Sequence, residues 1–233
     1  MKILAISDIH GHSEMLVSIL EKELKETNID VIVFSGDVAP YRAPHKTLEH
    51  LMKIVDLAEI YKIKQFLAVP GNMDVAEHYA KIKSSIYVNL HKNANVFENY
   101  VFIGFGGSPV TPFGTLLEFD EDAIENSLLD LYRSISDLLT RGYNLILVSH
   151  APPYGTKCDI AYSRSHVGSK GIRKFIELAK PLLVICGHIH ESRCIDNINS
   201  TVVVNPGPLY SGFYTIIEVE NGNVRAFQRN LRQ

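Results

Sequence analysis

The amino-acid sequence predicts an α/β fold in which two mixed β-sheets lie face to face, with helices on the outside. The first observation is that residues 2–72 alternate short apolar runs with amphipathic segments, which is typical of β-α units. The second is that the chain beyond residue 190 reads as strands and turns only. A β-α half followed by a β-only half favours two sheets packed against each other.

Apolar runs along the chain predict five strands that end in polar residues. Runs of Ile, Leu, Val and Ala this short do not suit a helix and are typical of strands buried on both faces. The runs are Lys2–Ser7, Val31–Gly36, Gln65–Gly71, Asn144–Ser149 and Leu182–Gly187.

One-sided apolar stripes predict the helices, with Ser13 and Asp120 as N-caps of the first and third. The predicted helices begin at Ser13, Thr47, Asp120 and Ser169 and end near Asn28, Tyr61, Gly142 and Pro181, respectively. Alternating apolar residues predict further strands, two of which form a hairpin turning at Glu98-Asn99. These strands cover residues 95–98, 100–105, 192–196, 201–204, 213–219 and 224–228.

The length of 233 residues allows one or two domains, and because nothing in the sequence marks a linker, we expect one domain spanning residues 1–233. The hydrophobic fraction of 46% and the charged fraction of 21% are those of a soluble globular chain. A net charge of −3 offers no basic surface for general nucleic-acid binding. Residues 1–6 meet Asp8 too soon for a signal peptide or a membrane span. The three cysteines show no paired spacing, so we expect unpaired cysteines, a reducing compartment and a cytoplasmic location.

Side chains that can bind a metal follow each of the five predicted strands. Asp8 and His10 stand two residues apart just past the first strand, so both project to the same side. Because sites in parallel sheets gather at the carboxyl ends of the strands, we expect the whole set in one place. Its members are Asp8, His10, Asp37, Asn72, His150, His188 and His190.

Any one of these strand ends, taken alone, has an ordinary interpretation. A strand can simply end in a polar residue, and Asn72 after Gly71 is typical of a turn. Four histidines, two aspartates and one asparagine, all at strand ends, indicate a metal centre instead.

The size of the ligand set predicts two metal ions. Seven ligands exceed the four of a tetrahedral site and leave no place for water on an octahedral ion. Two ions sharing a carboxylate fit, and only Asp8 or Asp37 can bridge. Nitrogen and oxygen donors without thiolate point to Mn, Fe, Co, Ni or Zn. Two such ions, about 3.5–4 Å apart, can generate a hydroxide and clamp a phosphoryl group, which makes phosphoester hydrolysis the expected chemistry.

The ordered motifs resemble those of the calcineurin-like metallophosphoesterase superfamily, over nearly the whole chain from Asp8 to about Gly207. They are Asp8-x-His10, Gly36-Asp37, Gly71-Asn72, Ser149-His150 and Gly187-His188-x-His190. The resemblance implies a four-layer αββα sandwich. Residues 150–153 and 166–169 look closest to small phosphoesterases related to cyclic-AMP phosphodiesterase.

The superfamily pattern also implies how the two metal ions are held. It places Asp8, His10, Asp37 and His190 on the first metal and Asp37, Asn72, His150 and His188 on the second. Asp37 then bridges the ions together with a water or hydroxide, which attacks a phosphoester, with phosphodiesters preferred over monoesters. The expected catalytic residues are Asp37, Asn72 and His150. The expected cofactors are two divalent ions, manganese first and iron, nickel, cobalt or zinc as alternatives.

One departure from the family pattern concerns the leaving group. The family motif Gly-Asn-His-Asp/Glu reads here as Gly71-Asn72-Met73-Asp74. The family histidine is thought to protonate the leaving group, and a thioether cannot. The Asp-Arg pair of the protein phosphatases is missing after Asp37. Tyr41 is not at the spacing of the purple acid phosphatase tyrosine, so both branches are set aside.

Four further residues, His12, Arg42, Arg164 and His166, are interpreted as substrate contacts, with a solvated surface position as the alternative for each. The expected partner is a small phosphoester, with no membrane or nucleic acid, and a homo-oligomer stays open. Two other functions are kept as alternatives. One is a non-catalytic interaction scaffold on the same fold, in which metal ligands are typically lost. The other is a DNA or RNA nuclease, which would call for a basic surface.

Overall fold

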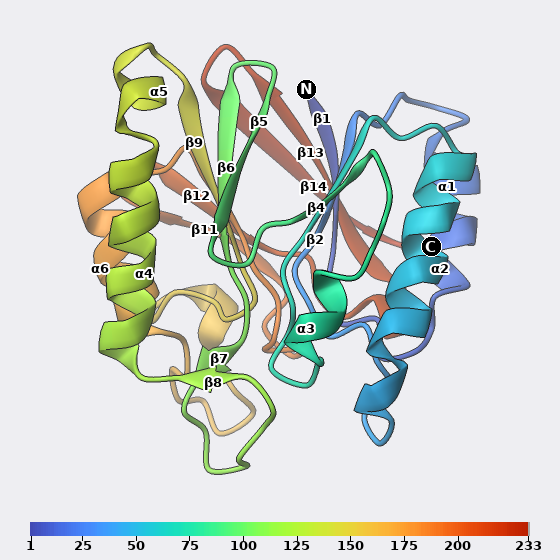
Figure 1. Ribbon diagram of the computed structural model, residues 1–233, viewed down its shortest axis with the longest axis horizontal. Helices are drawn as coiled ribbons and strands as arrows, with labels where there is room; N and C mark the ends of the chain where they lie inside the picture. The colour runs from blue at the N-terminus through green and yellow to red at the C-terminus, as the bar shows by residue number, and fades with distance from the viewer. Residues whose placement is uncertain (233) are drawn as a thin grey trace.

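The computed structural model describes residues 1–232 and shows two six-stranded sheets stacked between two layers of helices (Figure 1). The strand order is β14-β13-β1-β2-β3-β4 in the first sheet and β11-β12-β10-β9-β6-β5 in the second. Both sheets mix parallel and antiparallel neighbours. The predicted α/β architecture of two mixed sheets flanked by helices is therefore confirmed.

The first sheet contains the three N-terminal strands that were predicted to carry ligands. Its strands are β1 (Lys2–Ile6), β2 (Val31–Phe34), β3 (Gln65–Ala68), β4 (Tyr87–Asn89), β13 (Phe213–Glu220) and β14 (Asn223–Asn230). Strands β1 to β4 run parallel, whereas β13 and β14 pair antiparallel. Helices α1 (Met15–Glu23) and α2 (Thr47–Ile60) cover its outer face (Figure 1).

The second sheet contains the two later ligand strands. Its strands are β5 (Asn93–Phe97), β6 (Tyr100–Phe105), β9 (Asn144–Ser149), β10 (Leu183–Ile185), β11 (Cys194–Ile198) and β12 (Thr201–Asn205). The four central strands are parallel, and the edge strands β5 and β11 pair antiparallel with their neighbours. Helices α4 (Glu121–Ser134) and α6 (Lys170–Ala179) cover the outer face.

The apolar runs are explained by burial on both faces of each sheet. In β1, Leu4 and Ile6 pack into the core under α1 and α2, whereas Ile3 and Ala5 pack into the core between the sheets. Successive side chains of a strand point to opposite faces, so a strand covered on both sides has no polar position. This is why the predicted strands are nearly continuous runs of Val, Ile, Leu and Ala.

Short elements complete the chain. They are α3 (Ala76–Tyr79), α5 (Ser136–Thr140), the small pair β7 (Ser108–Pro109) and β8 (Glu118–Phe119), and 3₁₀ turns at Pro44–Lys46, Lys157–Asp159 and Leu209–Ser211. Residues 110–117 form the β7–β8 loop, which projects from the end of the sandwich where α3 lies (Figure 1).

Several helix predictions need correction. Helix α1 ends at Glu23, before the predicted end near Asn28, and Asp120 stands at the N-cap of α4 without a side-chain bond. The third predicted helix is interrupted at Ile135, which separates α4 from α5. The hydroxyl of Ser13 does not cap α1: it lies 2.9 Å from Nδ1 of His50 on α2, and Glu14 takes the N-cap position without a side-chain bond. Ser169 does open α6, because its Oγ accepts the N–H of Ile172 at 3.1 Å.

The prediction of unpaired cysteines was wrong. Cys158 and Cys194 form a disulfide, with Cα atoms 5.3 Å apart, although 36 residues separate them in the chain. The fold brings the 3₁₀ turn at Lys157–Asp159 against β11, and no spacing in the sequence could show this. Disulfides persist in oxidising environments, so the cysteines do not support the predicted reducing compartment. None of the helices within residues 1–232 is long and apolar enough to cross a membrane.

Candidate metal centre

The carboxyl ends of β1, β2, β3, β9 and β10 meet at one end of the sandwich. Hydrogen bonds between backbone groups join them within each sheet: Asp8 N–H donates to Gly36 O, and Gly187 N–H donates to His150 O, both at 2.9 Å. The hydroxyl of Ser35 crosses between the sheets and donates to Cys186 O at 3.0 Å. The predicted gathering of strand ends is therefore present in the structure.

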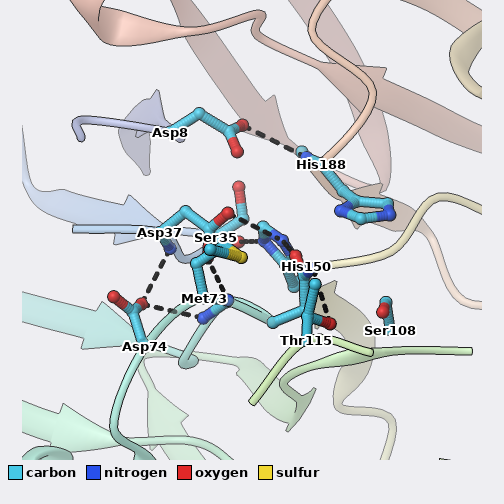
Figure 2. Close-up of polar contacts among 12 residues, drawn as sticks. Asp8, Ser35, Asp37, Met73, Asp74, Ser108, Thr115, His150 and His188 are labelled. Carbon is cyan, nitrogen blue, oxygen red and sulfur yellow. Dashed lines mark hydrogen bonds and ion pairs between the residues drawn. The ribbon is translucent and has the colours of Figure 1, made fainter. Parts of the chain in front are cut away.

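Two groups of side chains are arranged to hold a metal ion. The donor atoms of Asp8, His10 and His190 lie within 4.8 Å of one another, and so do those of Asp8, Asp37 and His150. Oδ1 of Asp8 is 3.1 Å from Nε2 of His190. Figure 2 shows Asp8, Asp37, His150 and His188 converging from four different strand ends.

The carboxylate of Asp37 belongs to the second group and also lies near His10 of the first. Its Oδ2 is 3.8 Å from Nε2 of His10 and 3.6 Å from Nε2 of His150. Asp8 is the residue that the two groups share. Both aspartates that could bridge two ions are thus central, and the bridging role of Asp37 stays a prediction.

Asn72 and His188 lie beside the second group. Oδ1 of Asn72 is 2.9 Å from Nε2 of His150, and its Nδ2 donates to Oγ1 of Thr115 at 3.0 Å. The ring of His188 packs edge-on against His150, with centroids 4.9 Å apart, and its backbone N–H donates to Oδ2 of Asp8. The structure therefore brings together all seven residues predicted as ligands.

The protonation of the imidazoles shows that these residues fit a cation. Nδ1 of His10 lies 3.3 Å from the carbonyl of Ala39, and Nδ1 of His150 lies 2.7 Å from the carbonyl of Ser35. A carbonyl only accepts, so each Nδ1 carries the proton and each Nε2 keeps a lone pair. Both lone pairs face the carboxylate of Asp37, which is also an acceptor.

Without a cation, these acceptor atoms have no donor to bind. Among residues 1–232, Nε2 of His10 has no hydrogen-bond partner although it is buried. Nε2 of His150 and Oδ1 of Asn72 present two lone pairs to each other at 2.9 Å. Imidazole and carboxylate donors around a shared point are typical ligands for a divalent transition metal, so the residues present fit such an ion.

Burial keeps the histidines neutral. It lowers the pKa of His10 to about 4 and that of His188 to about 3. Burial also lowers the pKa of His150, so at neutral pH these three rings are unprotonated. His190 differs: burial favours its neutral form, but the charge of Asp8, the hydrogen bond to Asp8 and the charge of Glu191 together outweigh burial and raise its pKa.

The surroundings shift the pKa values of Asp8 and Asp37 in opposite directions. Burial raises the pKa of Asp8, but attraction to His190 and the other imidazoles outweighs it and holds the pKa well below its usual range. Burial, followed by repulsion from Asp74 and Asp8, raises the pKa of Asp37 well above the usual range. Because negative charges surround the carboxylate of Asp37, a cation bound beside it would stabilise its ionised form.

The backbone at the ligands adopts an uncommon conformation. Asp8, His10, Asp37 and His188 have φ angles of 52°, 44°, 61° and 68°, in the left-handed region that favours glycine. Such conformations persist only where surrounding contacts hold them, and they concentrate at functional sites. Here the loops after β1 and β2 hold each other, because the N–H groups of residues 8–11 all donate to carbonyls of residues 36–38.

The glycines that precede ligands are required by close approach. A Cβ on Gly71 would overlap Oδ1 of Asp37, and a Cβ on Gly187 would overlap Oγ of Ser7. Any side chain at these positions would push apart the strand ends that carry the ligands. The Gly-ligand pattern, which occurs at three of the five strand ends, therefore reflects how tightly the strand ends pack.

Asp74 is a site residue that the sequence interpretation missed. Its buried carboxylate accepts the N–H group of Asp37 at 2.8 Å (Figure 2). It also accepts those of Gly71, Val38 and Ala39 at 2.9, 3.0 and 3.2 Å. It therefore joins the ends of β2 and β3 and orients Asp37. An aspartate in a turn suggests a carboxylate bonded to nearby N–H groups, but not that it reaches another strand.

Two tyrosines were also missed. The ring of Tyr41 stacks on His10, with centroids 3.7 Å apart and an interplanar angle of 15°. The hydroxyls of Tyr41 and Tyr210 each lie 3.2 Å from Nδ1 of His190. Both tyrosines therefore hold the ring of His190 at Nδ1, while its Nε2 faces the carboxylate of Asp8. Metal-binding histidines are usually held in this way through the nitrogen that does not bind the metal.

A cavity of about 430 Å³ opens beside the ligands, lined by Asp37, Asn72, His188 and His190 on one side. Met73 also lines it, and its backbone N–H donates to Oδ1 of Asp37 at 2.9 Å. A thioether thus stands next to the candidate metal centre. No proton donor occupies that position.

The four predicted substrate contacts lie at the surface and, as far as residues 1–232 define the cavity, outside its lining. His12 pairs with Glu14 at 3.4 Å, and Nδ1 of His166 pairs with the buried Asp159 at 2.7 Å. Arg42 follows Tyr41, which does line the cavity, and Arg164 is exposed on the loop before α6. Their role toward substrate stays a prediction.

Comparison with known proteins agrees with this geometry. Residues 1–192 match the family described as calcineurin-like phosphoesterase. An uncharacterized protein of Methanocaldococcus jannaschii is 40% identical over 212 residues, which cover 89% of this chain and 88% of that protein.

Two solved structures share the fold. The crystal structure of the protein TT1561 of Thermus thermophilus superposes with a TM-score of 0.73 at 20% identity, covering 99% of both chains. The phosphopantetheinyl hydrolase of Mycobacterium tuberculosis superposes with a TM-score of 0.55 at 14% identity, covering 88% of both chains. At these identities the likeness concerns the fold alone, and the sequence match carries the assignment. The chain belongs to the calcineurin-like phosphoesterase family.

Proposed function

We propose that residues 1–233 form one domain that hydrolyses phosphodiesters at a centre of two divalent metal ions. The observation that carries this proposal is the set of lone pairs around Asp37. Nε2 of His10 and Nε2 of His150 both face Oδ2 of Asp37, at 3.8 and 3.6 Å, while their Nδ1 atoms are tied to carbonyls. Acceptors on either side of one carboxylate oxygen suit two cations that share it.

The proposed ligands divide as the family pattern implies. Asp8, His10, Asp37 and His190 would hold one ion, and Asp37, Asn72, His150 and His188 the other, with manganese as the expected metal and iron, nickel, cobalt or zinc as alternatives. When bound, two such ions activate water at neutral pH and neutralise charge on the phosphoryl oxygens.

The protein's own residues hold and orient this centre. Burial keeps His10 and His188 neutral, so their nitrogens are available as ligands near pH 7. The hydrogen bond from Asn72 Nδ2 to Thr115 fixes the amide so that its oxygen faces His150. Asp74 holds the backbone of Asp37 from the opposite side. We take Asp37, Asn72 and His150 as the residues that act on the phosphoester.

Two observations bear on the substrate: within residues 1–232 no lysine or arginine lines the cavity, which favours a singly charged diester, and Met73 limits the leaving group. A thioether cannot protonate a departing alkoxide, so departure depends on the leaving group itself. Without this acid, esters of poor leaving groups are cleaved slowly, whether they are monoesters or diesters. Esters with a good leaving group, such as an aryl group, need no acid.

The test is to measure bound metal and turnover on the same preparation. The purified chain is stripped with a chelator, reloaded with Mn²⁺ and assayed on bis(4-nitrophenyl) phosphate, 4-nitrophenyl phosphate and 2′,3′-cyclic nucleotides. We expect about two metal ions per chain and faster cleavage of the diester. A protein that holds no transition metal and stays inert with Mn²⁺ would favour an interaction scaffold. Degradation of single-stranded DNA or RNA at a rate rivalling small diesters would favour a nuclease.

A further inference from the structure

The cavity beside the candidate metal centre has two chemically different walls. One wall is polar and consists of the proposed ligands Asp37, Asn72, His188 and His190. The rest of the lining is largely apolar and consists mainly of Tyr41, Met73, Phe113 and Leu116, which we call the apolar wall, together with Pro44. A substrate whose phosphoryl group lies at the polar wall would place its organic substituent against the apolar one.

The side chains of the apolar wall reach far into solvent. Phe113 is 85% exposed, Leu116 57% and Tyr41 50%. Single exposed apolar residues are ordinary on protein surfaces, but three around one cavity mark a binding site. Phe113 and Leu116 both come from the β7–β8 loop and Tyr41 from the loop after β2. Two separate loops therefore contribute to the same apolar wall.

The β7–β8 loop is held in place by the site itself. The carbonyl of Asn72 accepts the N–H of Leu117 at 3.1 Å, and Nδ2 of Asn72 donates to Thr115. The carboxylate of Glu118 accepts the hydroxyl of Thr111 at 2.6 Å and the N–H of Thr115 at 2.8 Å. These bonds connect the loop to a proposed metal ligand. Its apolar tip is consequently presented over the cavity.

The lack of basic side chains among the described residues of the cavity also favours a diester with an apolar ester group. Within residues 1–232, neither a lysine nor an arginine lines the cavity. A phosphomonoester dianion is typically bound by such cations, which supply charge-assisted hydrogen bonds. A diester carries a single charge and a second organic group that needs a surface to contact. An apolar wall offers few partners for the hydroxyls of a sugar.

We infer that the apolar wall formed by Tyr41, Met73, Phe113 and Leu116 binds an apolar alkyl or aryl substituent of the substrate. This inference rests on the proposed function and specifies its substrate class: phosphodiesters with at least one apolar, uncharged ester group. Sugar phosphates that carry no apolar or aromatic group are the class that it disfavours. The contribution of the wall is to binding, and it is separate from the effect of Met73 on the leaving group.

The experiment keeps the leaving group constant. A series of alkyl 4-nitrophenyl phosphates, with methyl, butyl and hexyl as the alkyl group, is assayed on the Mn²⁺-loaded protein. We expect kcat/KM to rise about tenfold from methyl to butyl, as for three half-buried methylene groups, and to rise further for hexyl. The same kcat/KM for all three esters would overturn the inference.

Variants locate the effect. Phe113→Ser and Leu116→Ser should each lower the butyl-to-methyl ratio of kcat/KM several-fold. Matched controls are Ile60→Ser on α2 and Leu178→Ser on α6, which are 70% and 59% exposed and lie outside the cavity lining. They should keep the wild-type ratio. Equal ratios in all four variants would also overturn the inference.

A binding measurement separates this inference from the proposed activity. Calorimetry compares dimethyl and dibutyl phosphate, which are not turned over on the timescale of titration. Tighter binding of the dibutyl ester by an inert protein would refute the activity and keep the apolar site. Hydrolysis independent of chain length, with equal binding of both esters, would refute the apolar site and keep the activity.

Discussion

Replacing Asp74 by asparagine tests whether this residue holds the candidate metal centre together. Oδ1 of Asp74 accepts the N–H groups of Val38 and Ala39, and Oδ2 accepts those of Gly71 and Asp37. Asp74→Asn replaces one oxygen with an amide that only donates. Whichever orientation the new side chain takes, two buried N–H groups then face a donor.

The magnitude follows from these two lost bonds. Each buried donor left without a partner costs about 1–3 kcal/mol, so Asp74→Asn should lower the free energy of unfolding by about 2–6 kcal/mol. That is a large fraction of the roughly 5–15 kcal/mol that stabilises a typical domain. The remaining oxygen also loses its charge, which weakens the bonds that it keeps, including the one from Tyr79 at 2.7 Å.

Urea unfolding of the chelator-treated protein, followed by circular dichroism at pH 7, measures this loss without any metal. The matched control is Asp196→Asn, because Asp196 accepts a single backbone N–H, from Lys157 at 2.8 Å, near the surface. The control should change the free energy of unfolding by less than about 1 kcal/mol. Equal stability of Asp74→Asn and this control would show that the bonds of Asp74 do not hold the ends of β2 and β3 together. Metal titration of Asp74→Asn should show weaker binding, since the backbone of Asp37 loses its support.

Three further outcomes are expected. Asp37→Asn should bind neither metal tightly and should lose more activity than Asn72→Ala, as measured by metal analysis and turnover. The control is Asp56→Asn at an exposed position. If Asp37→Asn retains two metals, the ligand assignment is wrong. Rates for diesters should fall steeply as the leaving-group pKa rises, and Met73→His should flatten that fall. A flat series in the unchanged protein would point to another acid. Burial lowers the pKa of His91 to about 4 from 6.5, so the stability it contributes is full above pH 6.5 and is lost as the pH falls toward 4. His91→Asn should therefore reduce the stability lost between pH 7 and pH 5 by about 1–2 kcal/mol in urea unfolding, and an identical pH dependence would contradict this.

Much of the fold was predictable because the information is local. A strand covered on both faces must be apolar at every position, so β1, β2, β3, β9 and β10 are visible as short apolar runs. The residue that follows each run must lie at the edge of its sheet. The seven predicted ligands follow from this rule, and the structure brings all of them to one end of the sandwich.

The glycines before Asp37, Asn72 and His188 belong to the same local information. They were visible in the sequence as small residues at strand ends. Glycine is required there for a spatial reason, because a Cβ on Gly71 or Gly187 would collide with a side chain from the end of a different strand. The sequence thus contained the pattern, and the packing of strand ends explains it.

Other features depend on contacts between distant parts of the chain. Asp74 is an ordinary turn residue until the end of β3 lies against that of β2, where its carboxylate meets the N–H groups of residues 37–39. Tyr41 is an ordinary loop tyrosine until it stacks on His10. The pairing of Cys158 with Cys194 required β11 to lie beside a loop that is 36 residues away in the sequence.

Sequence by itself therefore determined the fold class and the residue types gathered at the candidate centre. Tertiary structure decided which groups hold those residues and what surrounds them: the carboxylate of Asp74, the two tyrosines at His190 and the apolar wall formed in part by Phe113 and Leu116. The physical reason is that burial and strand periodicity act on neighbouring residues, whereas hydrogen bonds to a loop and walls of a cavity depend on where separate loops meet.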